Sequence, residues 1–370
     1  MNTTHSTFNK NIAGYTTIGG RERKNLAVID GDTVDTTGGN ANAGNIHTDG
    51  IHNEICAVIL NRHGQNPHRS FFQELEKTGF DNVISIESSS PNYNIEELSQ
   101  RFPFVRFIIP EKEINLGEQI NLAASEIDNP LFFVLQSDMK IIAGGTARRM
   151  AERLSVIQKE AEDNPIKFKR LCTVPVLVNS NYESIPTIVT PLTRNKKMST
   201  GIMEPHNEGE LSLYPFIGIG IYDRLKFINI GGFDPSIKNK HWQFMDFGFR
   251  SYLWGEEISL SLHLKILCEK EIPAVDYSVD KSYRQFFLKN LAPVFRKNGA
   301  HLPLCRFLPF LFKSNEDLLS AWEEFSNKRK WITENKDRFK RNDDDVINIW
   351  NNIPAETILE IETEQEQEPT

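Results

Sequence analysis

The sequence predicts an α/β protein with a mostly parallel central sheet flanked by helices. Short apolar runs typical of buried strands alternate with amphipathic helical patterns, as in parallel sheets with crossover helices. One such run, residues 131–135, ends abruptly on the polar triplet Gln136-Ser137-Asp138. The chain has 370 residues, 39% hydrophobic and 25% charged, and can therefore bury a full α/β core and carry a further segment.

Composition divides the chain into four segments. Residues 1–53 are rich in Thr, Asn and Gly and lack a hydrophobic period, so we expect them to be mostly disordered, with at most a short strand over residues 25–29. Residues 54–272 carry the alternating pattern of the main domain. Residues 273–354 read as a helical C-terminal extension, and residues 355–370 as an acidic, disordered tail.

The first half of the main domain is predicted to consist of strand–helix units. Strands are expected over residues 55–60, 83–86, 105–109 and 131–135, and helices over residues 67–78, 95–101, 115–127 and 146–161. Pro67 stands at the start of the first helix, a position that proline favours.

The second half changes character. Short β-rich runs at residues 171–178, 185–189 and 214–221 flank a polar stretch, residues 193–210, which we expect to be a mobile or functional loop. A turn at residues 231–235 precedes a predicted helix over residues 243–254 and an alternating strand over residues 258–267. Residues 280–350 have a helical pattern with many aromatic and basic side chains.

Composition also disfavours several classes of protein. A net charge of −8 argues against a general nucleic-acid binder. The four cysteines are far apart, so reduced and mostly buried thiols are favoured over a zinc site or a disulfide framework. We find no apolar run of about 18 residues and no signal-peptide pattern. The expectation is a protein that stays in the cytoplasm or contacts the inner face of a membrane only peripherally.

The triplet at residues 136–138 indicates nucleotide-diphosphate chemistry. Open α/β sheets bind ligands in the crevice at the carboxyl ends of their strands. A carboxylate at that edge, here Asp138, is suited to hold a divalent cation against a phosphate of the ligand.

Six motifs in a fixed order resemble those of inverting glycosyltransferases of the GT-A fold, close to glycosyltransferase family 2. The resemblance covers residues 54–270, and its order and spacing are more specific than any single motif. The motifs are a strand ending on Asn61, a strand ending on Glu87-Ser88-Ser89-Ser90, Gly117 with Asn121, the triplet ending on Asp138, the turn Gly231 to Asp234, and Asp246 followed by Arg250.

The resemblance implies a role for each of these positions. Asp246 would be the general base, and Asp138 would bind Mn²⁺ or Mg²⁺, with His263 as a further metal ligand. Glu87 would hydrogen-bond the nucleotide base. The other implied donor-binding residues are Asn61, Arg62, Asn121, Gly231, Gly232 and Arg250, with His63 beside them. Three positions depart from the family pattern: Glu87 stands for an aspartate, Gln136 for the first acid of the metal triplet, and Met245 for a glutamate.

The helix around Asp246 supports the same assignment from its own residues. Aromatic neighbours such as Phe244 and Phe247 would raise the pKa of the carboxyl and suit it to proton abstraction. Arg250 lies four residues later, where it could pair with Asp246 or reach a phosphate. A purely structural Asp–Arg pair is the plain alternative.

The implied reaction is transfer of a glycosyl group, with inversion, from a nucleotide-diphosphate sugar to a hydroxyl of a glycan, lipid-linked or protein acceptor. A nucleotidyltransferase is disfavoured, because the segment after the first strand, residues 61–66, has one glycine and one arginine rather than a Gly-rich basic loop. A non-catalytic sugar-nucleotide-binding or scaffold relative stays open, and Gln136 and Met245 favour it.

Overall fold

The computed structural model describes residues 14–20, 54–61, 69–143, 147–162, 169–194, 197–268, 275–296, 299–314 and 317–360. Within them, nine strands form one central sheet in the order β1-β4-β3-β2-β5-β10-β7-β11-β6. The strands are β1 (Tyr15–Gly19), β2 (Ile55–Leu60), β3 (Val83–Ile86), β4 (Val105–Pro110), β5 (Leu131–Gln136), β6 (Met139–Ala143), β7 (Lys169–Val178), β10 (Gly220–Asp223) and β11 (Glu256–Cys268).

The sheet is mostly parallel, as predicted. β2, β3, β4 and β5 run in one direction, and so do β7 and β11, whereas β1, β6 and β10 run the opposite way. All six residues of β2 and the last five of β5 are buried. Strands covered on both faces need such continuous apolar runs, and this confirms the α/β class.

The order of the strands reverses between β2 and β5. The chain adds β3 and then β4 on one side of β2, but it places β5 on the other side. Right-handed crossovers therefore put α2 and α3 on one face and α4 on the opposite face. A reversal of this kind opens a crevice beyond the carboxyl ends of the two strands, here after Leu60 and Gln136.

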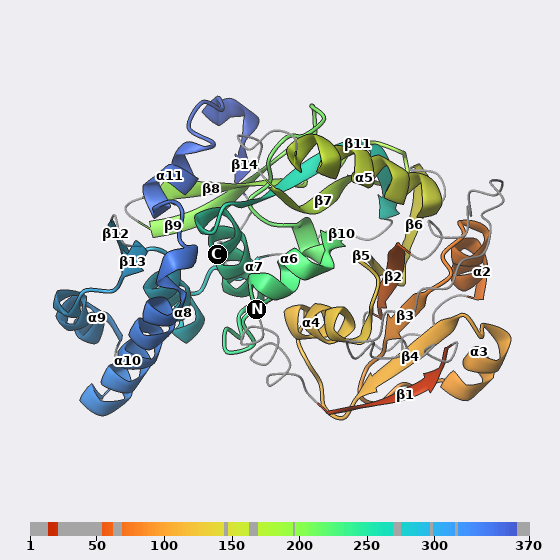
Figure 1. Cartoon of the computed structure of the whole chain (residues 1–370), viewed down its shortest axis with the longest axis horizontal. Helices are drawn as coiled ribbons and strands as arrows, with labels where there is room; N and C mark the ends of the chain where they lie inside the picture. Colours follow the sequence, from red (N-terminus) through yellow and green to blue (C-terminus); the bar gives the residue numbers. More distant parts are fainter. Residues whose placement is uncertain are drawn as a thin grey trace, which may run out of the picture.

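Helices cover the sheet and extend it at one end (Figure 1). The helices of the main domain are α2 (Arg69–Lys77), α3 (Ile95–Arg101), α4 (Leu116–Glu126), α5 (Ala147–Glu162), α6 (Arg224–Asn229) and α7 (Lys240–Leu253). Asn115 caps α4 in a reciprocal capping box with Glu118, which fixes where that helix begins. In Figure 1, α7 lies between the strands β2–β4 and the C-terminal helices.

The C-terminal extension packs on α7 through α8 (Lys281–Asn290). It continues with α9 (Phe307–Ser314), α10 (Leu318–Asn335) and α11 (Asp343–Asn348), and it includes a short hairpin of β12 (Val294–Arg296) and β13 (Gly299–His301) that the helical pattern did not predict. No helix in the described part of the chain is long and apolar enough to cross a membrane.

Three strands form where the sequence predicted a loop or a disordered segment. The expected loop over residues 193–210 contains β9 (Lys197–Met203), which pairs with β8 (Ile188–Arg194). The expected tail contributes β14 (Leu359–Glu360) to the edge of β9, and the N-terminal segment contributes β1 to the edge of β4. Of the run at residues 214–221, only the end is strand, because the turn η3 (Phe216–Gly218) precedes β10. The strand predicted over residues 25–29 lies outside the described residues.

Candidate functional site

The carboxyl ends of β2, β3 and β5 are joined by hydrogen bonds between the polar residues that end them. The Asn61 backbone N–H donates to Ile86 O at 3.0 Å, and the Ser137 N–H donates to Leu60 O at 3.2 Å. The Ser137 hydroxyl also donates to Asn61 Oδ1 at 3.3 Å. The predicted residues Asn61 and Glu87 therefore lie side by side at the carboxyl ends of β2 and β3. Arg62 and His63 lie outside the described residues.

Glu87 is buried and its carboxylate is already engaged by the protein. It accepts hydrogen bonds from the Ser85 hydroxyl at 2.5 Å, from Asn61 Nδ2 at 2.7 Å and from the Tyr93 hydroxyl. Burial and the neighbouring Glu87 raise the pKa of Tyr93, so its hydroxyl keeps the donor proton. Glu87 thus fixes the side chains of Asn61 and Tyr93, and the half-buried ring of Tyr93 stands beside the crevice.

Gln136 and Asp138 offer oxygen atoms at the end of β5. Gln136 is fully buried, and within the described residues neither of its amide atoms has a hydrogen-bond partner. Asp138 lies in the two-residue turn that leads from β5 to β6. No group of three His, Cys, Asp or Glu side chains able to hold a metal occurs in the described part of the chain. A cation such as Mg²⁺ prefers about six oxygens, so these residues suit an ion that arrives with a phosphate ligand.

His263 does not join Asp138. It is exposed on β11, where Cys268 pairs with Met139 and Lys265 with Ala143. Five residues along a strand span roughly 16 Å. The register therefore separates His263 from the turn that holds Asp138, and the two do not form the predicted metal site together.

Asn121 ties α4 to the Gly231–Asp234 turn. Its amide donates to Phe233 O at 2.8 Å and accepts from Phe233 N at 2.9 Å. Gly117, one turn earlier on α4, lies so close to Gln243 and Phe233 that a Cβ there would come within 2.4 Å of the Gln243 amide oxygen. Gly231 and Gly232 have φ angles of 84° and 59°, a conformation that glycine adopts without strain.

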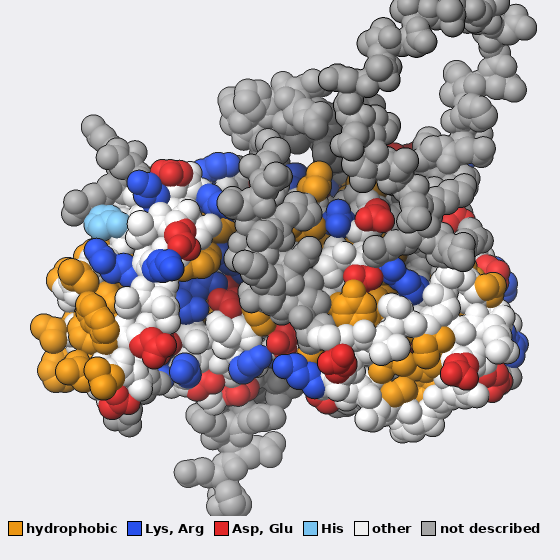
Figure 2. Space-filling model, turned by 60° about the horizontal axis from the view of Figure 1, so that its bottom comes forward, with side chains coloured by type: hydrophobic (Ala, Val, Ile, Leu, Met, Phe, Trp, Pro, Cys, Tyr) orange, Lys and Arg blue, Asp and Glu red, His pale blue; other side chains and the backbone are white. Residues whose placement is uncertain are grey.

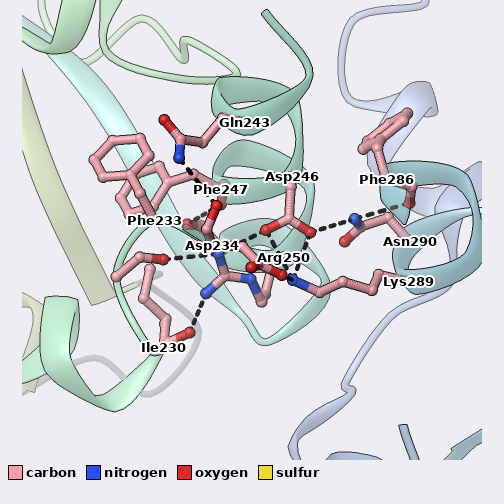
Figure 3. Close-up of polar contacts among 12 residues, drawn as sticks. Ile230, Phe233, Asp234, Gln243, Asp246, Phe247, Arg250, Phe286, Lys289 and Asn290 are labelled. Atoms are coloured by element: carbon pink, nitrogen blue, oxygen red, sulfur yellow. Dashed lines mark hydrogen bonds and ion pairs between the residues drawn. The ribbon is translucent and has the colours of Figure 1, made fainter. Parts of the chain in front are cut away.

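Asp246 lies at the centre of a buried network of charges (Figure 3). Its Oδ2 accepts from Arg250 Nη2 at 2.8 Å and from Lys289 Nζ at 3.0 Å. Its Oδ1 contacts Lys289 Nζ at 2.9 Å and accepts from Asn290 Nδ2 at 2.9 Å. A carboxylate offers about four acceptor sites, so these contacts fill Asp246, which has no exposed surface.

The same network holds the glycine turn. Arg250 donates to the backbone carbonyl of Ile230 and, at 2.7 Å, to that of Gly232. Lys289 Nζ also donates to Asp234 Oδ2 at 2.9 Å, and Lys328 Nζ lies 3.5 Å from the same oxygen. The ammonium of Lys289 further lies 4.6 Å from the centre of the Trp331 ring, a cation–π contact.

The expected raised pKa of Asp246 is wrong. Burial does raise the pKa of this carboxyl, but Lys289 and Arg250 outweigh that effect, and the net shift is downward. Burial likewise raises the pKa of Asp234, yet Lys289 and Lys328 hold it well below the usual value. Asp246 is therefore a charged partner of two cations, and the Asp–Arg pairing that the sequence offered as an alternative is formed.

A cavity of about 340 Å³ lies next to this network at the start of α7. Its inner wall is formed by Tyr214, Phe216, Ile217, His241 and Phe244, and Lys238, Lys240 and Asp276 stand at its edge. Residues 214–217 lead into β10, whose first residue, Gly220, pairs with Val134 near the carboxyl end of β5. Part of the cavity wall therefore lies at the same edge of the sheet as Asn61 and Asp138.

The structure thus groups the predicted residues into two neighbouring clusters. Asn61, Glu87 and Asp138 lie at the strand ends, and Asn121, Gly231, Gly232, Asp246 and Arg250 lie between α4 and α7. Sequence reasoning missed Tyr93, Lys289, Asn290 and the cavity residue His241. The Asn-Tyr-Asn segment after the strand end was a usable signal for Tyr93, whereas no local pattern connects Lys289 to Asp246, 43 positions away.

The sequence matches no family model and no curated protein. Solved structures with a similar chain arrangement include GalNAc-T7 with UDP, GalNAc and Mn²⁺, at a TM-score of 0.45 and 12% identity over 75% of this chain and 56% of that one. A fragment of S. aureus TarS gives a TM-score of 0.39 and 11% identity over 76% of this chain and 73% of the fragment, and its UDP complex scores the same. Both are GT-A-fold glycosyltransferases. This chain spans little more than half of GalNAc-T7.

Proposed function

We propose that the protein transfers a glycosyl unit from a nucleotide-diphosphate sugar to a hydroxyl acceptor, as the order of its sequence motifs implies. The observation that supports the proposal is the reversal of strand order between β2 and β5, with Asn61 and the Gln136–Asp138 triplet following the ends of these two neighbouring strands. Ligands of open α/β sheets bind at such a point. The nucleotide would lie over the ends of β2 and β3, with the Tyr93 ring beside its base.

The diphosphate would lie toward Asp138, where a divalent cation supplies charge neutralisation for the leaving group. In this proposal Glu87 does not contact the base itself. Its carboxylate holds Asn61 and Tyr93 in place, since its hydrogen bonds are made inside the protein.

Inversion by a single displacement requires a base near the acceptor hydroxyl. Asp246 was predicted for that role, but its acceptor sites are filled by Arg250, Lys289 and Asn290. We therefore assign Asp246 a positioning role: through Arg250 it fixes the carbonyls of Ile230 and Gly232 and hence the turn that Asn121 connects to α4.

The burial of Asp246 also favours a second candidate function, that of a non-catalytic protein that binds a sugar nucleotide. Turnover distinguishes the two. An enzyme releases free sugar slowly from its nucleotide donor even without acceptor, whereas a pure binder is stabilised by the ligand and shows no release.

The test is a thermal-shift panel of nucleotide diphosphates and their sugars, with and without Mn²⁺. A ligand at 100 times its Kd adds about 2.7 kcal/mol to the free energy of unfolding. We expect one nucleotide to raise Tm, more so with Mn²⁺, and Asp138→Asn to remove the Mn²⁺-dependent part. Asp128→Asn, an exposed aspartate before the amino end of β5, is the matched control. A panel without any shift would end the proposal.

We also propose a peripheral membrane contact through an exposed apolar surface on α9 and α10, visible as the orange group at the left of Figure 2. This apolar cap consists of Leu304, Leu308, Phe312, Leu318, Leu319 and Trp322. Phe312 is 84% and Leu319 79% exposed, so these side chains project outward. Projecting Leu and Phe side chains with a neighbouring Trp suit the boundary between lipid headgroups and acyl chains.

A further inference from the structure

The cavity at the start of α7 has features of a ligand site that the sequence motifs did not assign. Its volume of about 340 Å³ lies at the small end of the range for ligand pockets, too small for a whole nucleotide-diphosphate sugar but sufficient for one sugar ring. Aromatic side chains form much of its inner wall, with the rings of Tyr214 and Phe244 5.6 Å apart at their centres.

His241 brings a polar ring to the inner wall. It is 5% exposed, and neither of its ring nitrogens has a hydrogen-bond partner within the described residues. Burial lowers the pKa of His241 to about 3, against a smaller opposing effect of Asp276, so the ring is neutral at physiological pH. A neutral imidazole offers one donor and one acceptor, which matches the hydroxyl groups of a sugar.

The backbone around the cavity is strained. Ile217 has a φ of 45°, and the next residue, Gly218, has a φ of 80°. The left-handed conformation is unfavourable for a β-branched side chain, and strain of this kind concentrates at binding sites. Here it presents the Ile217 side chain to the cavity immediately before β10.

The edge of the cavity carries charged side chains, two of them lysines. Lys238 and Lys240 are exposed there, at the N-terminal end of the 14-residue helix α7. Lys238 lies 3.3 Å from Glu118. Asp276 is the acid at the edge, and it is occupied: it accepts from Asn239 Nδ2 at 2.9 Å and from Ser278 N at 2.9 Å. Lys240 and the N-terminus of α7 thus bring positive charge to the opening, beside the acid Asp276 and the ion pair of Lys238 with Glu118.

We propose that this cavity is the acceptor site and that it takes a sugar unit bearing a carboxylate or phosphate. The ring lies against Tyr214 and Phe244, a ring hydroxyl bonds His241, and the anionic substituent lies at Lys240 and Lys238. This inference rests on the proposed glycosyl transfer, because part of the cavity wall lies at the sheet edge that would hold the donor.

The test measures binding of glucuronic acid, glucose 6-phosphate and glucose to the full chain by calorimetry. We expect at least one of the two acids to bind about tenfold or more tightly than glucose, since hydrogen bonds to charged groups are worth that factor. The two acids separate a carboxylate from a phosphate preference. Lys240→Gln should remove the advantage of the acids, whereas Lys330→Gln, an exposed lysine on α10, should leave it unchanged.

His241→Phe keeps an aromatic ring of similar shape and should weaken binding of all three sugars. Because Lys240 is exposed, we expect its variant to fold, and it tests the preference for acids even if the His241 variant does not fold. Three outcomes would overturn the inference. The acids and glucose could bind equally well, none of the three could bind, or the Lys240→Gln variant could bind them as the Lys330→Gln control does. Nucleotide binding, followed on the same sample, separates the two proposals. A protein that binds nucleotide but no acidic sugar contradicts the acceptor class alone. A protein that binds acidic sugar but no nucleotide contradicts glycosyl transfer and leaves the cavity as a site for acidic sugars, without the role of an acceptor site.

Discussion

At the scale of single residues, the decisive feature is the concentration of charge around Asp246. Two cations, Arg250 and Lys289, and two carboxylates, Asp234 and Asp246, are brought together with little access to water. Removal of one partner from a buried ion pair leaves an uncompensated charge and costs about 3–5 kcal/mol. The network is therefore a strong determinant of how α7, α8 and the glycine turn fit together.

We predict that Asp246→Asn lowers the free energy of unfolding by about 3–5 kcal/mol and that Lys289→Met has a similar effect. The double variant should lose much less than the sum, because the two opposite charges vanish together. Urea denaturation of the four proteins gives this coupling. Turnover and nucleotide binding together then separate the two roles of Asp246. A stable double variant that binds nucleotide like the parent but remains about 10² to 10⁴ slower would restore Asp246 as the general base.

The pH dependence of stability follows from the lowered pKa values of Asp234 and Asp246. In the unfolded chain both carboxyls take up protons near 3.8, whereas in the folded chain they do so at lower pH. In that interval the unfolded state binds more protons, so the free energy of unfolding falls as pH decreases below about 4. In Asp234→Asn, the free energy of unfolding measured by urea titration should fall less steeply between about pH 5 and pH 3. An equal slope in the variant would contradict the assignment.

At the scale of elements, the contact between α4 and α7 sets the geometry of the site. Gly117 permits the close approach of Gln243 and Phe233. Alanine in a helix is favoured over glycine by about 1 kcal/mol, but overpacking a buried contact costs about 1–3 kcal/mol.

We therefore expect Gly117→Ala to destabilise the protein and to weaken donor binding, because α4 and the turn that Asn121 holds would separate from α7. Thermal unfolding and nucleotide titration measure the two effects. Gly117→Ala with Gln243→Ala removes the nearest colliding atom and should regain part of the loss. If the Gly117→Ala protein is as stable as the parent, Gln243 and Phe233 can move aside for the added methyl group at little cost.

Local patterns were sufficient for strands whose own residues are continuously apolar. β2 and β3 match the predicted ranges because their continuous apolar runs encode burial on both faces. β9 was missed because its residues look polar until β8 and β14 pair with it on either side. The prediction of the site residues had the same limit. Asn61 and Asp138 follow strand ends and were found from the local sequence. The hydrogen bonds from Lys289 and Asn290 that fill acceptor sites of Asp246 come from another helix and were missed.

At the scale of the whole molecule, the apolar cap lies at the end opposite β1–β4 (Figure 1). If it contacts a bilayer, the protein should float with phospholipid vesicles. Phe312→Ser with Leu319→Ser should reduce the bound fraction several-fold, since each CH₂ group in the membrane contributes about 0.8 kcal/mol. Leu225→Ser, 58% exposed on α6, is the control. The alternative outcome is that the parent protein binds no vesicles but forms a dimer, and that the double variant is a monomer. The apolar cap would then be an interface with a second copy of the chain.

Strand β14 has a consequence for the order of events during synthesis. It covers the open edge of β9, yet it consists of residues 359 and 360, which are synthesised long after residues 197–203 of β9. Until then the hairpin presents unpaired N–H and C=O groups to whatever is nearby, and such edges recruit foreign strands. The nascent chain is thus most prone to aggregate in the interval between completion of β9 and arrival of its last partner.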